Sequence, residues 1–232
     1  MKQICKLVVM LLLAFTAGVQ AQLVTYPESL NPGMPHNDDY TVRVRIPGGE
    51  WKDLFEYNVQ VDMDNVQNAS MVQFDMGSAV EVMVKKNNGS VREVTIRPLS
   101  KGIEYKQIQN AILFTLEKPQ YLSIEFDGDR LHNLHLFANP LETEKYDKET
   151  KGIMYFGPGV HRPKDLPNNQ IRIPGNTTVY LAPGAVVKAK LLVDKAENVR
   201  IIGRGILDHP IRGIDVTDSK EVVVGGVSVV GR

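Results

Sequence analysis

Short runs of β-branched residues recur at a nearly constant spacing through residues 170–232. The runs that begin at Val179, Val199 and Val222 each end at glycine or at Pro-Gly. Their spacing of roughly 20 to 23 residues is typical of solenoid repeats. Because a unit this short cannot bury its own apolar face, it has to stack on a neighbouring copy of itself. The pattern therefore predicts the first coils of a parallel β-helix over residues 171–232.

The same repeat predicts which side chains form the interior of the coils. Coils stack at the strand spacing of ~4.8 Å, so equivalent inward positions form apolar ladders. The expected inward residues are Val179 and Leu181, Val199 and Ile201, and Val222 and Val224. Asn198 is expected to form local hydrogen bonds between its side chain and the backbone at a corner. An ordinary buried strand at residues 184–187 is the alternative, and the period shared by three units favours the β-helix.

The first 21 residues have the three parts of a secretory signal peptide. Lys2 and Lys6 form a basic start, residues 7–15 form an apolar stretch, and Val19-Gln20-Ala21 has small residues at the cleavage positions. The apolar stretch is shorter than the about 20 residues that span a membrane. An uncleaved N-terminal anchor is the alternative. We therefore expect an exported protein, periplasmic or extracellular, with no membrane association once the signal peptide (1–21) is removed.

Composition excludes several classes of site from the rest of the chain. The only cysteine, Cys5, lies in the expected signal peptide, so the mature chain has no disulfide, thiol nucleophile or cysteine-bound metal. An exported protein without cysteine favours a bacterial origin. The formal charge of the whole chain is zero, and removal of Lys2 and Lys6 leaves 25 basic and 27 acidic residues, a net charge of −2. Without a basic stripe, no nucleic-acid partner is expected.

Residues 22–140 contain several short strands of alternating apolar and polar residues, which predicts an antiparallel β-sandwich domain. The expected strands are residues 40–46, 55–63, 80–84, 91–96, 112–116, 122–126 and 134–137. In residues 55–63 the odd-numbered positions are apolar, and Glu56, Asn58, Gln60 and Asp62 form the polar face. Asn87-Asn88-Gly89 can adopt the positive φ angles of a tight hairpin, so residues 80–84 and 91–96 are expected to pair across it.

Residues 141–170 are expected to connect the two domains. The first part is charged and has no apolar periodicity, and it is followed by Tyr155-Phe156-Gly157-Pro158-Gly159-Val160-His161. The aromatic pair can pack while the glycines and prolines turn the chain. Pro163 and Pro167 cannot lie in central strands.

Three motifs resemble the first coils of right-handed parallel β-helix glycoside hydrolases. They are Tyr155-Phe-Gly-Pro-Gly-Val-His161, Val179-Tyr-Leu-Ala-Pro-Gly-Ala-Val-Val187 and Asn198-Val-Arg-Ile-Ile-Gly-Arg-Gly-Ile-Leu-Asp208. The chain is similar to the polygalacturonase-like family 28 and to the dextranase and isopullulanase family 49, of which the latter also has an N-terminal β-sandwich. The resemblance covers about 78 residues, 155–232.

The resemblance implies an all-β chain, with an N-terminal antiparallel β-sandwich followed by the first coils of a right-handed parallel β-helix. It also implies an exported hydrolase that cleaves a polysaccharide, either pectin or polygalacturonate or an α-glucan, with inversion and without a cofactor. Two aspartates would serve as general acid and general base. The motifs that carry them in these families are an Asn/Ser-X-Asp-Gly-Ile-Asp run, an Asp-Asp pair, a Gly-His-Gly and an Arg-X-Lys, and none follows residue 208. We therefore expect the catalytic residues beyond Arg232, and a monomeric chain that is inactive alone.

One segment partly resembles the aspartate motif of these families. In Arg212-Gly-Ile-Asp-Val-Thr-Asp-Ser219, Arg212 stands in place of the first aspartate. We expect Ile214 and Val216 to point inwards, Asp215 and Thr217 to point outwards, and Asp218-Ser219 to form a turn. Asp208 is expected to form a turn before His209-Pro210. No catalytic residue is therefore assigned.

Two patterns suggest metal ligands but fail on spacing. His132 and His135 lie three positions apart on an expected strand, so their side chains face opposite sides. Asp62-Met63-Asp64 begins like a calcium loop but lacks the third oxygen ligand and the glycine. It is expected instead on the solvated face of its strand. No metal site is assigned.

Three further features have a structural and a functional interpretation. Asp38-Asp39 precedes a strand and indicates a solvated turn. Gly157-Pro158-Gly159 is not a phosphate loop, because no Lys-Ser/Thr and no helix follows it. Trp51 could stack on a sugar, although a single tryptophan in a sandwich more often packs in the core or at an edge. The alternative to a hydrolase is therefore a non-catalytic carbohydrate-binding or structural module, and no substrate-binding residue is assigned.

Overall fold

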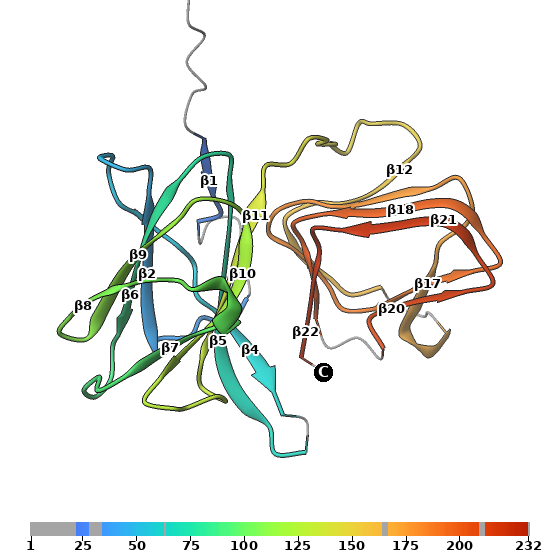
Figure 1. The fold of residues 1–232 in the computed structure, drawn as a ribbon. Helices are drawn as coiled ribbons and strands as arrows, with labels where there is room; N and C mark the ends of the chain where they lie inside the picture. Colours follow the sequence, from blue (N-terminus) through green and yellow to red (C-terminus); the bar gives the residue numbers. More distant parts are fainter. Residues whose placement is uncertain (1–21, 28–33, 63, 164–166, 209–211, 232) are drawn as a thin grey trace, which may run out of the picture.

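The structure is a computed structural model that describes residues 22–27, 34–62, 64–163, 167–208 and 212–231. A β-sandwich and a parallel β-helix lie side by side (Figure 1), as the sequence predicts. Among the described residues, the only helical elements are the 3₁₀ turns Leu99–Lys101 and Pro167–Asn169, and no helix is long and apolar enough to cross a membrane. The expected signal peptide, residues 1–21, lies outside the described residues.

The sandwich consists of a six-stranded and a five-stranded sheet. The first contains β1 (Leu23–Thr25), β4 (Tyr57–Val61), β5 (Gln67–Met76), β7 (Val94–Arg97), β10 (Gln120–Phe126) and β11 (Leu134–Pro140). The second contains β2 (Tyr40–Arg45), β3 (Lys52–Asp53), β6 (Val80–Lys86), β8 (Lys106–Ile108) and β9 (Ala111–Leu116). The pairing is antiparallel except between β5 and β11, which run parallel.

The alternating strands bury one face each in the core between the two sheets. In β2, Val42 and Val44 are fully buried, and Val82 of β6 lies opposite Val44 in the register. Phe74 and Leu136 close the core from the other sheet. Burial of a valine or leucine side chain stabilises the fold by roughly 1.5–3 kcal/mol. The period-2 pattern therefore identified these strands because each one has a wet face and a buried face.

The hairpin expected at Asn87-Asn88-Gly89 is wrong. Gly89 has a positive φ of 76°, but β6 pairs with β2 and β9, whereas β7 pairs with β10 in the opposite sheet. The chain therefore crosses from one sheet to the other at this point. The crossing places Val94 and Ile96 on the far side of the same core, where they are buried.

The longest strand, β5, has no alternation and was not among the expected strands. Every residue from Ala69 to Met76 is buried. Val72 and Phe74 face the core of the sandwich, whereas Met71 contacts a second apolar cluster that includes a residue of the β-helix. A strand that is covered on both faces does not need a polar face, so period-2 reasoning does not detect it.

The β-helix has three parallel sheets. The first contains β12 (Ile153–Phe156), β15 (Thr178–Leu181), β18 (Glu197–Gly203) and β21 (Lys220–Gly225). The second contains β13 (Gly159–His161), β16 (Ala185–Val187), β19 (Ile206–Asp208) and β22 (Ser228–Val230). The third contains β14 (Gln170–Arg172), β17 (Lys190–Asp194) and β20 (Ile214–Thr217). Strand β12 begins at Ile153, so the Tyr155-Phe156 part of the expected connector belongs to the first coil.

The expected residues form the interior ladders, but only the last two runs align by their first valines. Val179 lies beside Ile201 and Ile201 beside Val224, whereas Val199 lies beside Val222. Val179, Val199 and Ile201 are fully buried, but Val224 remains 46% exposed at the open side of the last coil. The predicted repeat length was correct. Because each run has apolar residues at alternate positions, the sequence alone does not show which of them align between neighbouring coils.

Candidate functional site

The two domains meet at an apolar seam, and this seam determines where any site between them can lie. Phe55, Tyr57 and Met71 of the sandwich form one buried cluster with Ile206 of β19. Phe55 and Tyr57 pack edge to face, with ring centroids 4.8 Å apart. The apolar face of β4 therefore points at the β-helix and not into the sandwich core. This orientation also reverses the environment expected for Glu56.

Glu56, which was expected on a wet face, is 6% exposed. Its carboxylate accepts a hydrogen bond of 2.7 Å from the Val42 amide and lies 3.2 Å from Nε2 of His36. Burial raises the pKa of Glu56, and the hydrogen bonds from Val42 and His36 oppose the shift. The carboxylate serves to hold the start of β2, because it satisfies an amide at the rim of the core.

Arg204, the arginine of the Gly-Arg-Gly-Ile-Leu-Asp motif, links the β-helix to the sandwich. Its Nε donates to Asp75 of β5 over 2.7 Å, and the two side chains are 7% and 1% exposed. Its Nη2 donates to the Pro140 carbonyl at 2.7 Å. In return, the Gln73 amide donates to the Arg204 carbonyl at 3.1 Å. The ion pair is therefore buried and supported by additional hydrogen bonds, the condition under which buried charges are tolerated.

Other ionisable groups surround this ion pair. Burial raises the pKa of Glu142, and the nearby Arg204 lowers it in part. Burial and the neighbouring Asp75 raise the pKa of Tyr26. The Tyr180 hydroxyl donates to Glu142 at 3.2 Å. The cluster combines two carboxylates with one guanidinium, and its groups are engaged in contacts that join the domains. Glu142 and Arg204 border only a small pocket of about 160 Å³.

The segment that connects the domains covers the outer face of the first β-helix sheet (Figure 1). Glu144 forms a bidentate ion pair with Arg200 of β18, at 2.6 and 2.7 Å. The hydrogen bonds from Arg200 and Tyr146 lower the pKa of Glu144 to about 2. Tyr146 packs edge to face on Tyr180, which in turn stacks on Tyr155 in the preceding coil. The strap formed by this segment is therefore fixed to β15 and β18 by ion pairs, hydrogen bonds and ring packing.

Three aspartates of the β-helix are each paired with a basic residue of the preceding coil. Asp194 accepts a hydrogen bond from Arg172 at 2.9 Å, and Asp215 accepts one from Lys190 at 2.8 Å. Asp208, the last residue of β19, forms an ion pair with Lys188. An acid–base pair for glycoside hydrolysis needs two carboxyl groups that face one bond. These carboxylates instead form cross-coil ladders of opposite charge.

Residues 212–219 adopt the strand and turn expected for them. Ile214 packs against the interior cluster, and Val216 lies in register with the buried Val193. Val216 is nevertheless 47% exposed, because no described strand stacks on β20. The Ser219 hydroxyl donates to the Thr217 carbonyl at 2.7 Å and forms the turn. His209 and Pro210 lie outside the described residues.

The remaining candidates occupy structural positions in the sandwich and at the corners. The ring of Trp51 is covered by the Arg45 guanidinium, 4.3 Å from its centroid, which occupies one face that a sugar would use. Asp62 has a positive φ and accepts a hydrogen bond from the Asn65 amide in the β4–β5 turn, so it does not continue the strand. Asn198 also has a positive φ of 57°. Its amide donates to the Asn176 side chain at 3.1 Å, so it forms a ladder between coils and not the expected bond to the backbone.

The two histidines do not lie on one strand as expected, because His132 precedes β11. His132 lies beside Asp129, with 3.0 Å between Nδ1 and the carboxylate, whereas His135 is in β11, where burial lowers its pKa. Among the described residues, no group of three or more histidine, cysteine, aspartate or glutamate side chains could hold a metal ion. Gly157 accepts a hydrogen bond from the ring of His161 at 2.7 Å, so the Gly-Pro-Gly segment forms a corner.

The sequence did not reveal the two charged residues of this seam, the buried Asp75 and the arginine that reaches it. Asp75 lies in β5, which the alternation did not detect, and Arg204 is separated from it by 129 positions. A charged residue between two glycines in a solenoid repeat is the one signal that could have pointed to Arg204. Such a residue has a side chain that points away from the coil, at a place where the flanking glycines allow two backbone segments to come close together.

Comparison with known proteins supports the fold. No protein-family model matches the sequence, and no curated protein matches it. Eight chains of solved structures match, among them Dex49A from Penicillium minioluteum, with a TM-score of 0.59 and 21% sequence identity. The match covers 76% of this chain and 46% of that chain, so the present chain spans about half of the length of that structure. At this identity the likeness concerns the fold alone.

Proposed function

We propose that this chain is the N-terminal portion of an exported glycoside hydrolase that acts on a polysaccharide. One observation carries the proposal: the chain shares its fold with Dex49A and also has the three motifs that resemble β-helix glycoside hydrolases of families 28 and 49. The likeness to Dex49A agrees with the second of these families. The proposed substrates are a pectin-like polymer or polygalacturonate, or an α-glucan.

The proposed chemistry is inverting hydrolysis by two aspartates that lie outside this chain. One carboxylic acid protonates the leaving oxygen, and the other carboxylate activates water on the opposite face of the sugar. Within the described residues, Asp194, Asp208 and Asp215 are held by cations of neighbouring coils. Carboxylates engaged in this way do not face one common bond, as the acid and the base of a glycosidase must. The acid and the base are therefore assigned to coils that would stack on β21 and β22.

In this proposal the sandwich supports the first coils. The buried pair between Arg204 and Asp75 and the strap from residue 141 onwards connect the two domains at separate places. Such bracing matters for a site on a solenoid, because each coil is stabilised only by its neighbours. The protein would act outside the cytoplasm of a bacterium, as a monomer.

The proposal is tested by activity and by gene structure. The purified chain is incubated with pectin, polygalacturonate and dextran, and the release of reducing ends is measured. We expect no turnover, and clear turnover would contradict the placement of the catalytic aspartates beyond this chain. The reading frame after Arg232 is then sequenced. Further coils with paired aspartates are expected, whereas a stop codon in that place would overturn the proposal.

A further inference from the structure

A small cavity opens at the end of the sandwich, where β2 begins and where β6 and β10 end. We call it the end pocket; its volume is about 200 Å³. The buried rings of Tyr40 and Phe126, 4% and 1% exposed, pack on each other at its inner end, with centroids 5.3 Å apart. Its polar wall consists of Asp39, Lys86, Asn88, Asp129 and His132. The volume is below the range for drug-sized ligands, so it has room for a single ring.

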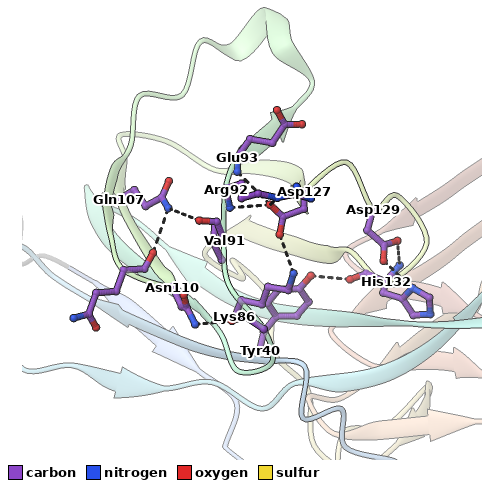
Figure 2. Close-up of polar contacts among 12 residues, drawn as sticks. Tyr40, Lys86, Val91, Arg92, Glu93, Gln107, Asn110, Asp127, Asp129 and His132 are labelled. Atoms are coloured by element: carbon purple, nitrogen blue, oxygen red, sulfur yellow. Dashed lines mark hydrogen bonds and ion pairs between the residues drawn. The ribbon is translucent and has the colours of Figure 1, made fainter.

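Hydrogen bonds inside the protein fix the wall of the end pocket (Figure 2). Asp129 accepts from the amides of Leu131 and His132, both at 3.0 Å. The Tyr40 hydroxyl donates to the His132 carbonyl at 2.7 Å. These bonds hold the loop of residues 127–132 against the start of β2. A ligand would therefore meet a wall that loses little conformational entropy on binding.

A second set of bonds fixes the ammonium group of the wall. Nζ of Lys86 lies 3.1 Å from Asp127, whose other carboxylate oxygen accepts from the amides of Arg92 and Glu93 at 2.8 and 3.3 Å (Figure 2). The backbone hydrogen bond from Arg92 is the largest cause that lowers the pKa of Asp127, followed by the bond from Lys86. An ammonium group has three donors, so one bond to Asp127 leaves donors for a ligand.

The hydrogen-bonding groups of the wall that remain free include both donors and acceptors. In the described part of the chain, the side chains of Asp39 and Asn88 form no hydrogen bond, so they add carboxylate and amide groups. The ammonium of Lys86 disfavours a metal cation, and the carboxylates of Asp39, Asp127 and Asp129 disfavour an anion. A sugar hydroxyl both donates and accepts, so a sugar can use groups of both kinds at once.

We propose that the end pocket binds one neutral hexose unit of a glycan. This goes beyond the proposed hydrolase, because it assigns a non-catalytic sugar site to the sandwich. It also separates the candidate substrates: the carboxylates of the pocket suit an α-glucan and repel a polygalacturonate chain. A single ring in a pocket of this size binds with a dissociation constant on the order of millimolar.

The test follows backbone amides of the isotope-labelled, purified chain by NMR during titration with isomaltotriose and maltotriose. We expect the amide signals of Leu131 and His132 to shift with at least one of them, and trigalacturonate to leave both signals in place. Asp39→Ala and Asn88→Ala should each raise the dissociation constant roughly tenfold, since each removes one ligand contact and no bond of the fold. Glu50→Ala, on a loop at the other end of β2, is the matched control and should bind as the parent does.

Three results would overturn the proposal. They are the absence of shifts with both neutral trisaccharides, equal binding of trigalacturonate, or unchanged affinity in both Asp39→Ala and Asn88→Ala. Because the titration measures binding and not hydrolysis, its outcome is independent of the activity assay. The reading frame after Arg232 tests the hydrolase and the titration tests the end pocket, so the failure of one proposal is distinguishable from the failure of the other.

Discussion

Replacement of Arg204 by methionine should weaken the fold far more than the loss of an ordinary surface ion pair. Asp75 is 1% exposed and would lose the guanidinium that compensates the burial of its carboxylate. Removal of one member of a buried ion pair costs about 3–5 kcal/mol of unfolding free energy. Arg204→Met also deprives the Pro140 carbonyl of its guanidinium donor. The loss would be a large fraction of the about 5–15 kcal/mol that holds a typical domain folded.

The magnitude is measured by urea denaturation, with circular dichroism as the readout. Arg200→Met is the matched control, because it removes the pair with Glu144, whose side chains are 34% and 41% exposed. An exposed pair contributes only about 0–1 kcal/mol. The double variant Asp75→Leu/Arg204→Met should recover at least half of the loss, since no charge remains buried. The remainder reflects the unsatisfied Pro140 oxygen.

The reasoning is refuted if Arg204→Met loses no more stability than Arg200→Met. It is also refuted if the double variant is as unstable as the single one, because the cost would then come from lost packing and not from a stranded charge. A variant too unstable to purify still permits the test, since recovery of soluble, folded protein by the added Asp75→Leu change is itself the expected result.

Three further predictions concern the coils and the strap. Gly203→Ala should destabilise the β-helix by at least ~2 kcal/mol in thermal or urea unfolding, because φ is 128° and a Cβ would overlap the backbone oxygen of the preceding coil. Asn198→Val should cost ~1 kcal/mol in the same assay through its positive φ and the lost ladder, whereas Asn198→Gly should cost less. The pKa of Glu144 is lowered to about 2 from 4.5, so its pair with Arg200 contributes stability above pH 4.5 that is lost as the pH falls to about 2. The stability difference between the parent and Glu144→Gln should therefore vanish over that window, and a constant difference would contradict the pairing.

The sequence predicted those strands whose two faces meet different environments. The alternation in residues 40–46 and 80–84 located β2 and β6 because each faces the core on one side only. It failed for β5, which is covered on both sides, and it placed Glu56 in water because the apolar face of β4 was assumed to point at the sandwich core. Both errors have one cause. The order of apolar and polar residues in a strand indicates whether one face or both faces are buried, but it does not indicate which neighbouring sheet or domain buries them.

The β-helix could be predicted further than the sandwich because its contacts are local in sequence. Each strand pairs with the strand one coil away, so a period of 22 or 23 residues contains the pairing, as in Val179 beside Ile201 and Ile201 beside Val224. The pairing of β5 with β11, by contrast, joins Ser70 to Leu134. No period in the sequence encodes such a contact. The charged residues of the seam belong to this second kind, and for that reason the candidate site was the least predictable part.

The Gly-Arg-Gly segment shows why a motif that resembles a hydrolase family need not be catalytic. A Cβ at Gly203 would overlap the Leu181 carbonyl oxygen, and one at Gly205 would lie 2.6 Å from the Leu181 Cβ. The two glycines thus allow the third coil to approach the second, and Arg204 between them is turned outwards to Asp75. A Cβ at Gly226, one coil later, would overlap the guanidinium itself. Three glycines therefore make room for one buried arginine, and the segment is constrained by the attachment of the sandwich. If the chain is part of a hydrolase, this motif serves to join its two domains, and the catalytic residues lie in other coils.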